Sequence, residues 1–497
     1  MPSRDGALLT PSAPSALEGA SLLRNDLFIS DRWVPASDGA RFDVVDPATS
    51  ASITSVASAT RNDVESAIAA AADAFPAWAA LPAPERARAL RRWYELILEH
   101  VDELAAILTA EQGKPLREAA GEIRYGAGFI EWFAEESKRL YGETIPTNAP
   151  GRRILTIRQP VGVAAAITPW NFPMAMITRK AGPALAAGCT LVRKPASETP
   201  LSALALAELA SRAGLPPGVL NVVVGDARLI GEVITQSPTV RALSFTGSTE
   251  IGRLLLEQCA GTIKKVALEL GGNAPLIVFD DADLDVAVQG AIASKFRNAG
   301  QTCVCANRIL VQSGIHDAFV ARLEEAVGEL RVGNGFDEAT DQGPLISDAA
   351  VRKVEEHIAD AVSRGAQVTV GGAPHERGGT YFEPTVLVGA TPEMLIASDE
   401  TFGPVAPVFR FDTEAEAISL ANCTESGLAA YFFTRDQGRA WRVGEALEFG
   451  VVGVNTGLIS YEGAPFGGVK QSGLGREGSR HGIDEYLDYK YLCVEGI

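Results

Sequence analysis

The sequence is poor in the residues that hold together small secreted or membrane-bound proteins. Its 497 residues include only 6 cysteines, and no apolar run reaches the roughly 18 residues of a membrane span. Cysteines this sparse do not form a disulfide scaffold and fit a reducing, cytoplasmic compartment. The first 26 residues lack the apolar core of a secretory signal, so we expect a disordered tail over residues 1–26.

Metal and nucleic-acid chemistry are equally poorly supported. Only Cys303 and Cys305 lie close in sequence, and Cys-x-Cys without neighbouring His or Cys partners is a poor zinc pattern. The net charge of -18 argues against binding of nucleic acid or an anionic membrane. It does not exclude a small anionic substrate that is held by local arginines. No histidine falls in a catalytic motif, which disfavours a cysteine hydrolase.

Length and hydrophobic patterning predict an α/β protein of two or three domains. Residues 62–111 have helical spacing of apolar residues, and Pro160 marks a change of pattern. Strand-like and helix-like segments then alternate, which predicts a parallel sheet wrapped by helices. The expected strands are 161–167, 190–193, 219–224, 242–246 and 265–270.

A second α/β set begins after Asp280, with helices expected near 286–297 and 318–329 and a strand at 308–311. The segments 148–159 and 486–494 resemble edge strands that lie outside this alternation. Such strands often pair across subunits, so we expect a homodimer or homotetramer.

A reachable thiol is the first chemical feature. Cys303 lies in the small, polar turn 298–305 (Asn-Ala-Gly-Gln-Thr-Cys-Val-Cys), whereas a structural cysteine usually lies in an apolar run. Glu269 ends an apolar strand and precedes two glycines, where burial would raise its pKa toward that of a general base. Together the two residues predict covalent acyl chemistry.

The second feature is a weak dinucleotide pattern. The G-x-G-x-x-G fingerprint is absent, but Gly247 and Ser248 lie at a strand-to-helix junction whose backbone N–H groups can hold a pyrophosphate. Lys194 follows a strand directly and would point off the carboxyl end of the sheet. The alternatives are an ordinary turn and a solvated loop lysine.

Three polar residues near these motifs could act on a substrate. Asn171, in a turn between two prolines, offers a neutral amide donor for an oxyanion. Arg179 and Arg297 could clamp a carboxylate in bidentate fashion. A turn asparagine and structural ion pairs are the alternatives.

Four segments together resemble the aldehyde dehydrogenase family, over about residues 27–497. They are residues 169–173, 268–272, 296–303 and 400–404. Within that family, residues 176–180, 303–308 and 465–478 look like the succinate-semialdehyde dehydrogenase subfamily.

The resemblance implies a Rossmann-like cofactor-binding domain, an α/β catalytic domain and a small β oligomerisation element. We place them as follows: cofactor-binding domain 27–147 and 160–278, catalytic domain 279–479, and oligomerisation strands 148–159 and 480–497.

The resemblance also implies roles for single residues. The catalytic set is Cys303 as nucleophile, Asn171 with the Cys303 N–H as oxyanion hole, and Glu269 as the activator of water. Cofactor contacts are implied for Trp170, Lys194, Gly247, Ser248, Glu400 and Phe402. Arg179, Arg297 and Ser460 are implied to bind the substrate carboxylate. Cys305 is implied to be a second cysteine that is able to pair with the nucleophile.

Ser197 bears on the choice of cofactor. Family members that prefer NAD often have glutamate at this position, which would repel a 2′-phosphate, whereas serine can donate to it. Arg193 and Lys194 add positive charge nearby. We therefore expect NADP as the preferred cofactor, with NAD also accepted.

Two other functions compete with oxidation of succinate semialdehyde to succinate. A dehydrogenase of glutarate semialdehyde, or of another acid-terminated aldehyde, would use the same arginines, because one methylene changes selectivity by only about 1–3 kcal/mol. A catalytically silent structural homologue is disfavoured by the intact Cys303, Glu269 and Asn171.

Overall fold

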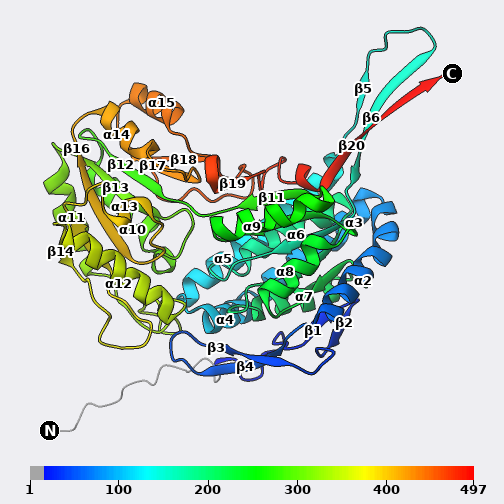
Figure 1. Cartoon of the computed structure of the whole chain (residues 1–497), viewed down its shortest axis with the longest axis horizontal. Coiled ribbons are helices and arrows are strands. Elements are labelled where there is room, and N and C mark those ends of the chain that lie inside the picture. Colours follow the sequence, from blue (N-terminus) through cyan, green and yellow to red (C-terminus); the bar gives the residue numbers. More distant parts are fainter. Residues whose placement is uncertain (1–15, 497) are drawn as a thin grey trace.

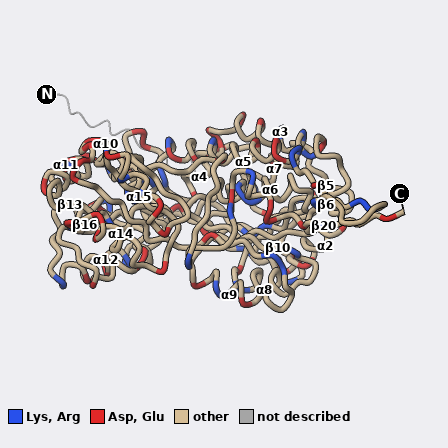
Figure 2. Tube along the Cα trace, turned by 90° about the horizontal axis from the view of Figure 1, so that it is seen from above, with Lys and Arg blue, Asp and Glu red and all other residues tan. Residues whose placement is uncertain are grey.

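Two large sheets and a projecting β arm organise the chain (Figure 1). The computed structural model describes residues 16–496. None of its helices in that range is long and apolar enough to cross a bilayer. Lys and Arg segments are interspersed with Asp and Glu segments over the outline of the molecule (Figure 2).

The first sheet has eight strands, of which the five central ones are parallel. In spatial order they are β19 (Gly473–Leu474), β11 (Lys265–Glu269), β10 (Val240–Thr246), β7 (Val163–Ile167), β8 (Thr190–Lys194), β9 (Leu220–Val222), β1 (Leu27–Ile29) and β2 (Arg32–Val34). The strands that the apolar runs predict are all present, and the parallel sheet is confirmed.

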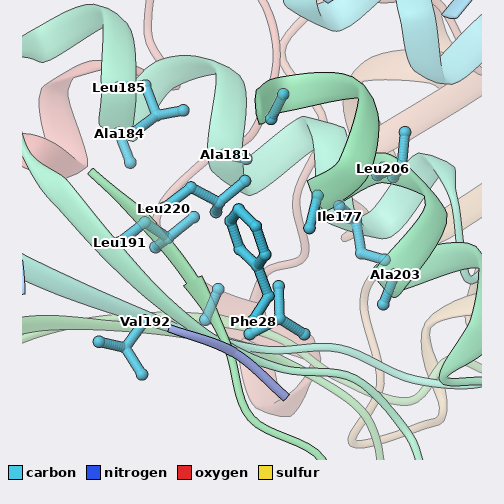
Figure 3. Close-up of a cluster of buried hydrophobic side chains, with 14 of the residues drawn as sticks. Phe28, Ile177, Ala181, Ala184, Leu185, Leu191, Val192, Ala203, Leu206 and Leu220 are labelled. Atoms are coloured by element: carbon cyan, nitrogen blue, oxygen red, sulfur yellow. The ribbon is translucent and has the colours of Figure 1, made fainter. Parts of the chain in front are cut away.

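Eight helices accompany this sheet: α2 (Arg61–Ala80), α3 (Ala83–Glu99), α4 (Val101–Gln112), α5 (Leu116–Glu136), α6 (Ala175–Ala187), α7 (Leu201–Arg212), α8 (Ala227–Gln236) and α9 (Thr249–Cys259). The helical stretch expected over 62–111 is three helices, because Pro82 and His100 interrupt it. Phe28 lies among aliphatic side chains of α6, α7, β8 and β9 (Figure 3).

The second sheet has seven strands, parallel except for one edge. In order they are β14 (Gln367–Val370), β15 (Thr385–Val388), β16 (Val405–Phe411), β13 (Ala306–Gln312), β12 (Ala274–Val278), β17 (Ala429–Phe433) and β18 (Val451–Val454). The associated helices are α10 (Leu284–Lys295), α11 (His316–Gly328), α12 (Asp348–Ser363), α13 (Leu395–Ser398), α14 (Glu414–Asn422) and α15 (Gln437–Ala446). The chain therefore passes from the first sheet to the second between β11 and β12, slightly before the domain boundary that we expect after residue 278.

The two expected edge strands pair with each other inside the chain. β6 (Arg152–Pro160) and β20 (Leu487–Glu495) are antiparallel over nine residue pairs, and β5 (Glu143–Ile145) pairs with the other edge of β6. This three-stranded arm extends from the body and carries the C-terminal end (Figure 1). A separate hairpin joins β3 (Arg41–Val45) and β4 (Ser52–Ala57).

The expectation of a disordered tail over residues 1–26 is wrong for residues 16–26. Leu17 and Leu22 are buried in the first core, and the Leu22 backbone N–H donates to Glu103 over 2.7 Å. The partner carboxylate is 81 residues away in sequence, so no local pattern could reveal this anchor. The part of the expected tail before residue 16 lies outside the described residues.

Leu22→Ala should lower the free energy of unfolding by about 2–4 kcal/mol, since a fully buried leucine loses its contacts and leaves a cavity. Denaturant unfolding followed by circular dichroism measures this. Glu18→Ala, at an exposed position nearby, is the matched control. Equal stability of Leu22→Ala and the parent would show that this segment does not anchor the chain.

Candidate active site

Two cavities meet at Cys303. One has a volume of about 410 Å³ and the other about 330 Å³, and Cys303 and Met176 lie in the walls of both. We call the larger one the switch-point cleft; its other lining residues are Pro169, Trp170, Asn171, Glu198, Thr246, Gly247, Ser248, Leu270, Gly271, Ile346, Ser347, Ala349, Ala350, Lys353, Glu400, Thr401 and Phe402. We call the smaller one the arginine pocket; its other lining residues are Glu118, Gly121, Glu122, Tyr125, Phe172, Arg179, Arg297, Val304, Leu458, Ser460 and Phe466.

The switch-point cleft lies where the strand order of the first sheet reverses. From β7 the chain continues to β8 and β9 on one side, and β10 then returns to the other side of β7. Trp170 follows β7, and Gly247 and Ser248 follow β10, so all three come from the carboxyl ends of adjacent strands. Dinucleotides bind at this position in open α/β sheets.

Five of the predicted cofactor residues line this cleft: Trp170, Gly247, Ser248, Glu400 and Phe402. Trp170 and Phe402 face each other edge-on with their ring centroids 5.5 Å apart. The Ser248 side chain accepts from the N–H of Ile251 and so caps α9 at the edge of the cleft. Trp170, Gly247 and Ser248 come from the first sheet, while Glu400 and Phe402 come from the segment before β16 of the second sheet, so both sheets contribute to the cleft.

Lys194 and Ser197 lie beside the cleft and not on its wall. Lys194 ends β8, and its ammonium group forms no hydrogen bond or ion pair with any residue in 16–496, although the residue is only 4% exposed. Burial lowers its pKa, while the carboxylates of Glu198 and Asp226 oppose that effect. The Ser197 hydroxyl donates to the Gly225 carbonyl over 3.2 Å.

Arg193 is fully buried, and its guanidinium has no hydrogen-bond partner within the described chain. Burial lowers its pKa to about 9. Nothing in the structure brings this charge to the cleft wall, so Arg193 adds less to the cofactor side than its sequence position suggests.

The wall of the cleft fits a dinucleotide. The Thr246 hydroxyl on the wall is buried and has no partner among residues 16–496. A Cβ at Gly271 would lie 3.0 Å from a Glu400 carboxylate oxygen, and one at Gly247 would lie 2.4 Å from the Phe245 ring. The side chains of Glu400 and Phe245 therefore leave little room for a side chain at either position, which suits glycine.

Asn171 is fixed between the two sheets. Its side-chain amide donates to the Gln301 carbonyl over 3.1 Å, which leaves one amide hydrogen free to meet a ligand. The backbone carbonyl of Asn171 accepts from Lys114 Nζ at 2.8 Å and from Asn298 Nδ2 at 3.0 Å. The turn after β7 is therefore tied directly to the loop that carries Cys303.

A buried ion pair holds this turn in place. Lys114 Nζ lies 2.6 Å from Glu122, and both side chains are 1% exposed. The other Glu122 oxygen accepts from the N–H groups of Met174 and Ala175 at the start of α6. The carboxylate thus also caps a helix N-terminus, where negative charge is favourable.

The thiol of Cys303 follows a strained stretch of backbone. Asn298, Ala299 and Gly300 all have left-handed φ values, of 52°, 55° and 73°. Burial raises the pKa of the Cys303 thiol to about 12, and the Arg179 guanidinium opposes the shift. The thiol must therefore lose its proton before the sulfur can act as a nucleophile.

Glu269 does not line either cavity. It is 5% exposed at the end of β11, and one of its oxygens is buried without a partner in the described chain. Burial and the nearby charge of Glu477 raise its pKa well above the usual value, while Arg179 and Lys180 oppose the shift. The carboxylate must turn toward Cys303 to act on it.

The arginine pocket brings Arg179, Arg297 and Ser460 together with Cys303. Arg179 also pairs with Glu477 over 2.8 Å and lies 3.9 Å from the Phe466 ring centroid, so it has a structural role as well. Arg297 is half-buried and pairs with no carboxylate of residues 16–496. An unpaired guanidinium in a small pocket is suited to an anionic ligand.

Cys305 points away from both cavities. Its sulfur lies 3.2 Å from the Gly300 carbonyl and 3.7 Å from Lys295 Nζ, and the residue is 2% exposed. The arrangement agrees with a packing role, and pairing with Cys303 requires the side chain to rotate.

Several site residues were not found from the sequence. The wall contributed by α5 (Glu118, Gly121, Glu122 and Tyr125) has helical spacing, but many helices show such a face. Lys353 lines the cleft and donates to the Glu400 carbonyl. Glu477 and Lys180 fall within segments that carry the family resemblance, yet no local pattern shows that they meet.

The chain belongs to the aldehyde dehydrogenase family, whose model matches residues 33–492. It is therefore an oxidoreductase that acts on a small aldehyde. The Escherichia coli K12 succinate-semialdehyde dehydrogenase [NADP(+)] GabD is 61% identical over 96% of this chain and 99% of that protein. The glutarate-semialdehyde dehydrogenase of Pseudomonas aeruginosa PAO1 is also 61% identical, over 97% and 100%. The crystal structure of an NADP-dependent E. coli enzyme has a TM-score of 0.95 and 61% identity, and covers 95% of this chain and 98% of that one.

Proposed function

We propose that the protein oxidises succinate semialdehyde to succinate with a nicotinamide cofactor. One observation carries the proposal: a thiol lies at the meeting point of a dinucleotide-type cleft and a pocket that contains an unpaired arginine. The names of the relatives support the substrate and the cofactor. The arginines act on the far end of the substrate, while Cys303 acts on the aldehyde.

Cys303 is the nucleophile in this proposal. The thiol loses its proton to solvent, and the sulfur then adds as the thiolate to the aldehyde carbon. The remaining Asn171 amide hydrogen and the Cys303 N–H stabilise the oxyanion. A nicotinamide cofactor held in the switch-point cleft would supply the acceptor for the hydride that leaves this carbon. Glu269 then activates the water that hydrolyses the Cys303 thioester and releases the acid.

The cleft would hold NADP in preference to NAD, and both would be accepted. Lys194 and Glu400 would hold ribose hydroxyls, while Trp170, Gly247 and Ser248 would border the pyrophosphate and Phe402 the nicotinamide side. Ser197 would donate to a 2′-phosphate. Glu198 and Asp226 place negative charge near Lys194, which limits the preference for the extra phosphate.

We also propose that the enzyme is a cytoplasmic homodimer or homotetramer with the domain division given above. The arm formed by β5, β6 and β20 supports assembly, because β20 exposes Tyr489 and Tyr491 by 66% and 59%. Exposed aromatic residues on a projecting edge strand favour association with another subunit. Light scattering of the purified protein would give the number of subunits.

Glutarate semialdehyde is the second candidate substrate. The P. aeruginosa enzyme that bears this name is as similar in sequence as the E. coli succinate-semialdehyde dehydrogenase. Both aldehydes end in a carboxylate, and the arginine pocket offers the same donors to each. Ratios of kcat/KM on the two aldehydes decide between them.

Arg297→Met should lower kcat/KM for succinate semialdehyde, because a desolvated charge pair is lost. The expected loss corresponds to about 2–5 kcal/mol of transition-state stabilisation. Butanal, which has the same chain length and no carboxylate, should be affected far less. Steady-state assays with both aldehydes and with glutarate semialdehyde measure this. Arg322→Met, which removes an exposed ion pair, is the control. Equal losses on butanal and the semialdehyde would make Arg297 structural.

Glu269→Gln should slow thioester hydrolysis much more than the first turnover. Stopped-flow absorbance should show a burst of reduced cofactor and then a slow steady state. The parent's steady-state rate should rise with pH, because only the carboxylate form activates water and its pKa is raised; the variant should lose this rise. The exposed Glu355→Gln serves as control. A burst that is lost in proportion to the steady state would assign Glu269 to the addition step alone.

Mild peroxide should inactivate the enzyme reversibly. The Cys303 thiol would become a sulfenic acid, and the Cys305 thiol would then displace water to form a disulfide. Dithiothreitol should restore the parent but not oxidised Cys305→Ala, because a sulfenic acid without a resolving partner is oxidised further by peroxide to the sulfinic acid, which dithiothreitol does not reduce. The buried Cys189→Ala should behave as the parent. Absence of a Cys303–Cys305 crosslink by mass spectrometry would exclude the switch.

A further inference from the structure

Tyr125 lies on a wall of the arginine pocket and has no part in the reaction described above. It belongs to α5, where Glu118, Glu122 and Tyr125 follow one another at intervals of four and three residues. Residues at this spacing share one helix face. All three line the pocket, so this face of α5 is turned toward the substrate.

The Tyr125 hydroxyl is buried and has no hydrogen-bond partner within residues 16–496. It lies beside the Ser460 side chain without meeting it in hydrogen-bond geometry, and it is close enough to Arg179 and Arg297 for their charges to lower its pKa. An unsatisfied buried hydroxyl costs about 1–3 kcal/mol. A ligand oxygen that accepted from it would remove that cost.

The orientation of the Tyr125 ring is set by packing. Phe129, one turn later on α5, meets it edge-on with centroids 5.0 Å apart and an interplanar angle of 78°. Phe129 is itself 1% exposed and lies 5.4 Å from the guanidinium carbon of Arg179. The hydroxyl is therefore held in place before any ligand enters.

We propose that the Tyr125 hydroxyl is a specificity-determining donor to the carboxylate of the substrate, alongside Arg179, Arg297 and Ser460. The inference rests on the proposed function, because it concerns the same pocket. Burial is the largest influence on the Tyr125 pKa and raises it, so the phenol keeps the proton that it donates.

Two carboxylates on the same wall do not oppose this assignment. Glu122 is neutralised by Lys114. Glu118 accepts from the Asn298 N–H over 2.9 Å, and burial raises its pKa while Lys114, the Asn298 N–H and Arg297 counter the shift. The pocket therefore keeps positive charge for an anion.

Tyr125→Phe is the decisive variant, because it removes only the oxygen. We expect kcat/KM for succinate semialdehyde to fall about 10- to 100-fold, the loss of a hydrogen bond to a charged group, with most of the change in KM. Activity on butanal should stay within about twofold of the parent. Tyr381→Phe, at a buried tyrosine that lines neither cavity, is the matched control.

Binding of the product gives a second readout. The ligand-free variant should be at least as thermally stable as the parent, since an unsatisfied hydroxyl is removed. Calorimetry should show succinate binding about 10-fold or more weaker, and the rise in melting temperature caused by succinate should shrink. A purely structural role would instead lower the ligand-free melting temperature and the activity on both aldehydes.

Assays of the parent enzyme distinguish failure of the proposed function from failure of the role of Tyr125. If it does not favour succinate or glutarate semialdehyde over butanal, the proposed function fails. If it does favour them but Tyr125→Phe keeps the parent's preference and succinate affinity within about twofold, only the role of Tyr125 is overturned.

Discussion

The active site depends on one buried cation, Lys114. Its ammonium group pairs with Glu122, donates to the Asn171 carbonyl and lies 3.9 Å from the Phe172 ring centroid. Removing one member of such a buried pair typically costs about 3–5 kcal/mol, because the remaining charge stays uncompensated. Here the cost would fall on the turn that carries Asn171, the oxyanion donor that we propose. Asn298 and Gln301 extend the same network to the loop of Cys303, so two sheets are coupled through a few hydrogen bonds.

A second buried charge cluster governs the base. Glu477 lies between Arg179 and Lys180, and Glu269 is nearby. Two carboxylates share two cations, and the cations hold the Glu477 pKa low while that of Glu269 rises. The better-paired carboxylate therefore has the lower pKa, and the poorly paired one has the raised pKa that suits the base we propose. Arg179 belongs to both this cluster and the substrate pocket, which links recognition of a carboxylate to the protonation of the base.

Much of the fold could be predicted, because parallel strands are nearly continuous apolar runs and their turns carry proline or glycine. Residues that lie in short motifs, as Cys303 and Asn171 do, could be expected to share one cavity, and both line the switch-point cleft. What could not be predicted depends on distant contacts. Leu22 is anchored by a glutamate of α4, Glu269 is influenced by the charge of Glu477, and the Cys305 sulfur lies 3.2 Å from the Gly300 carbonyl. In each case the deciding partner is absent from the local sequence or has no spacing that identifies it.

Chemistry and specificity come from different parts of the structure. The groups that we propose to react lie at strand ends and in the Cys303 loop, which hydrogen bonds tie to the turn after β7. The far wall of the pocket belongs to α5 and to the segment around Ser460, and Leu458 beside it is 55% exposed. One methylene in a substrate changes selectivity by only about 1–3 kcal/mol, which small shifts of such a wall can supply. Relatives named for succinate and glutarate semialdehydes can therefore be equally similar to this chain, because few of the shared residues determine the length of the acid.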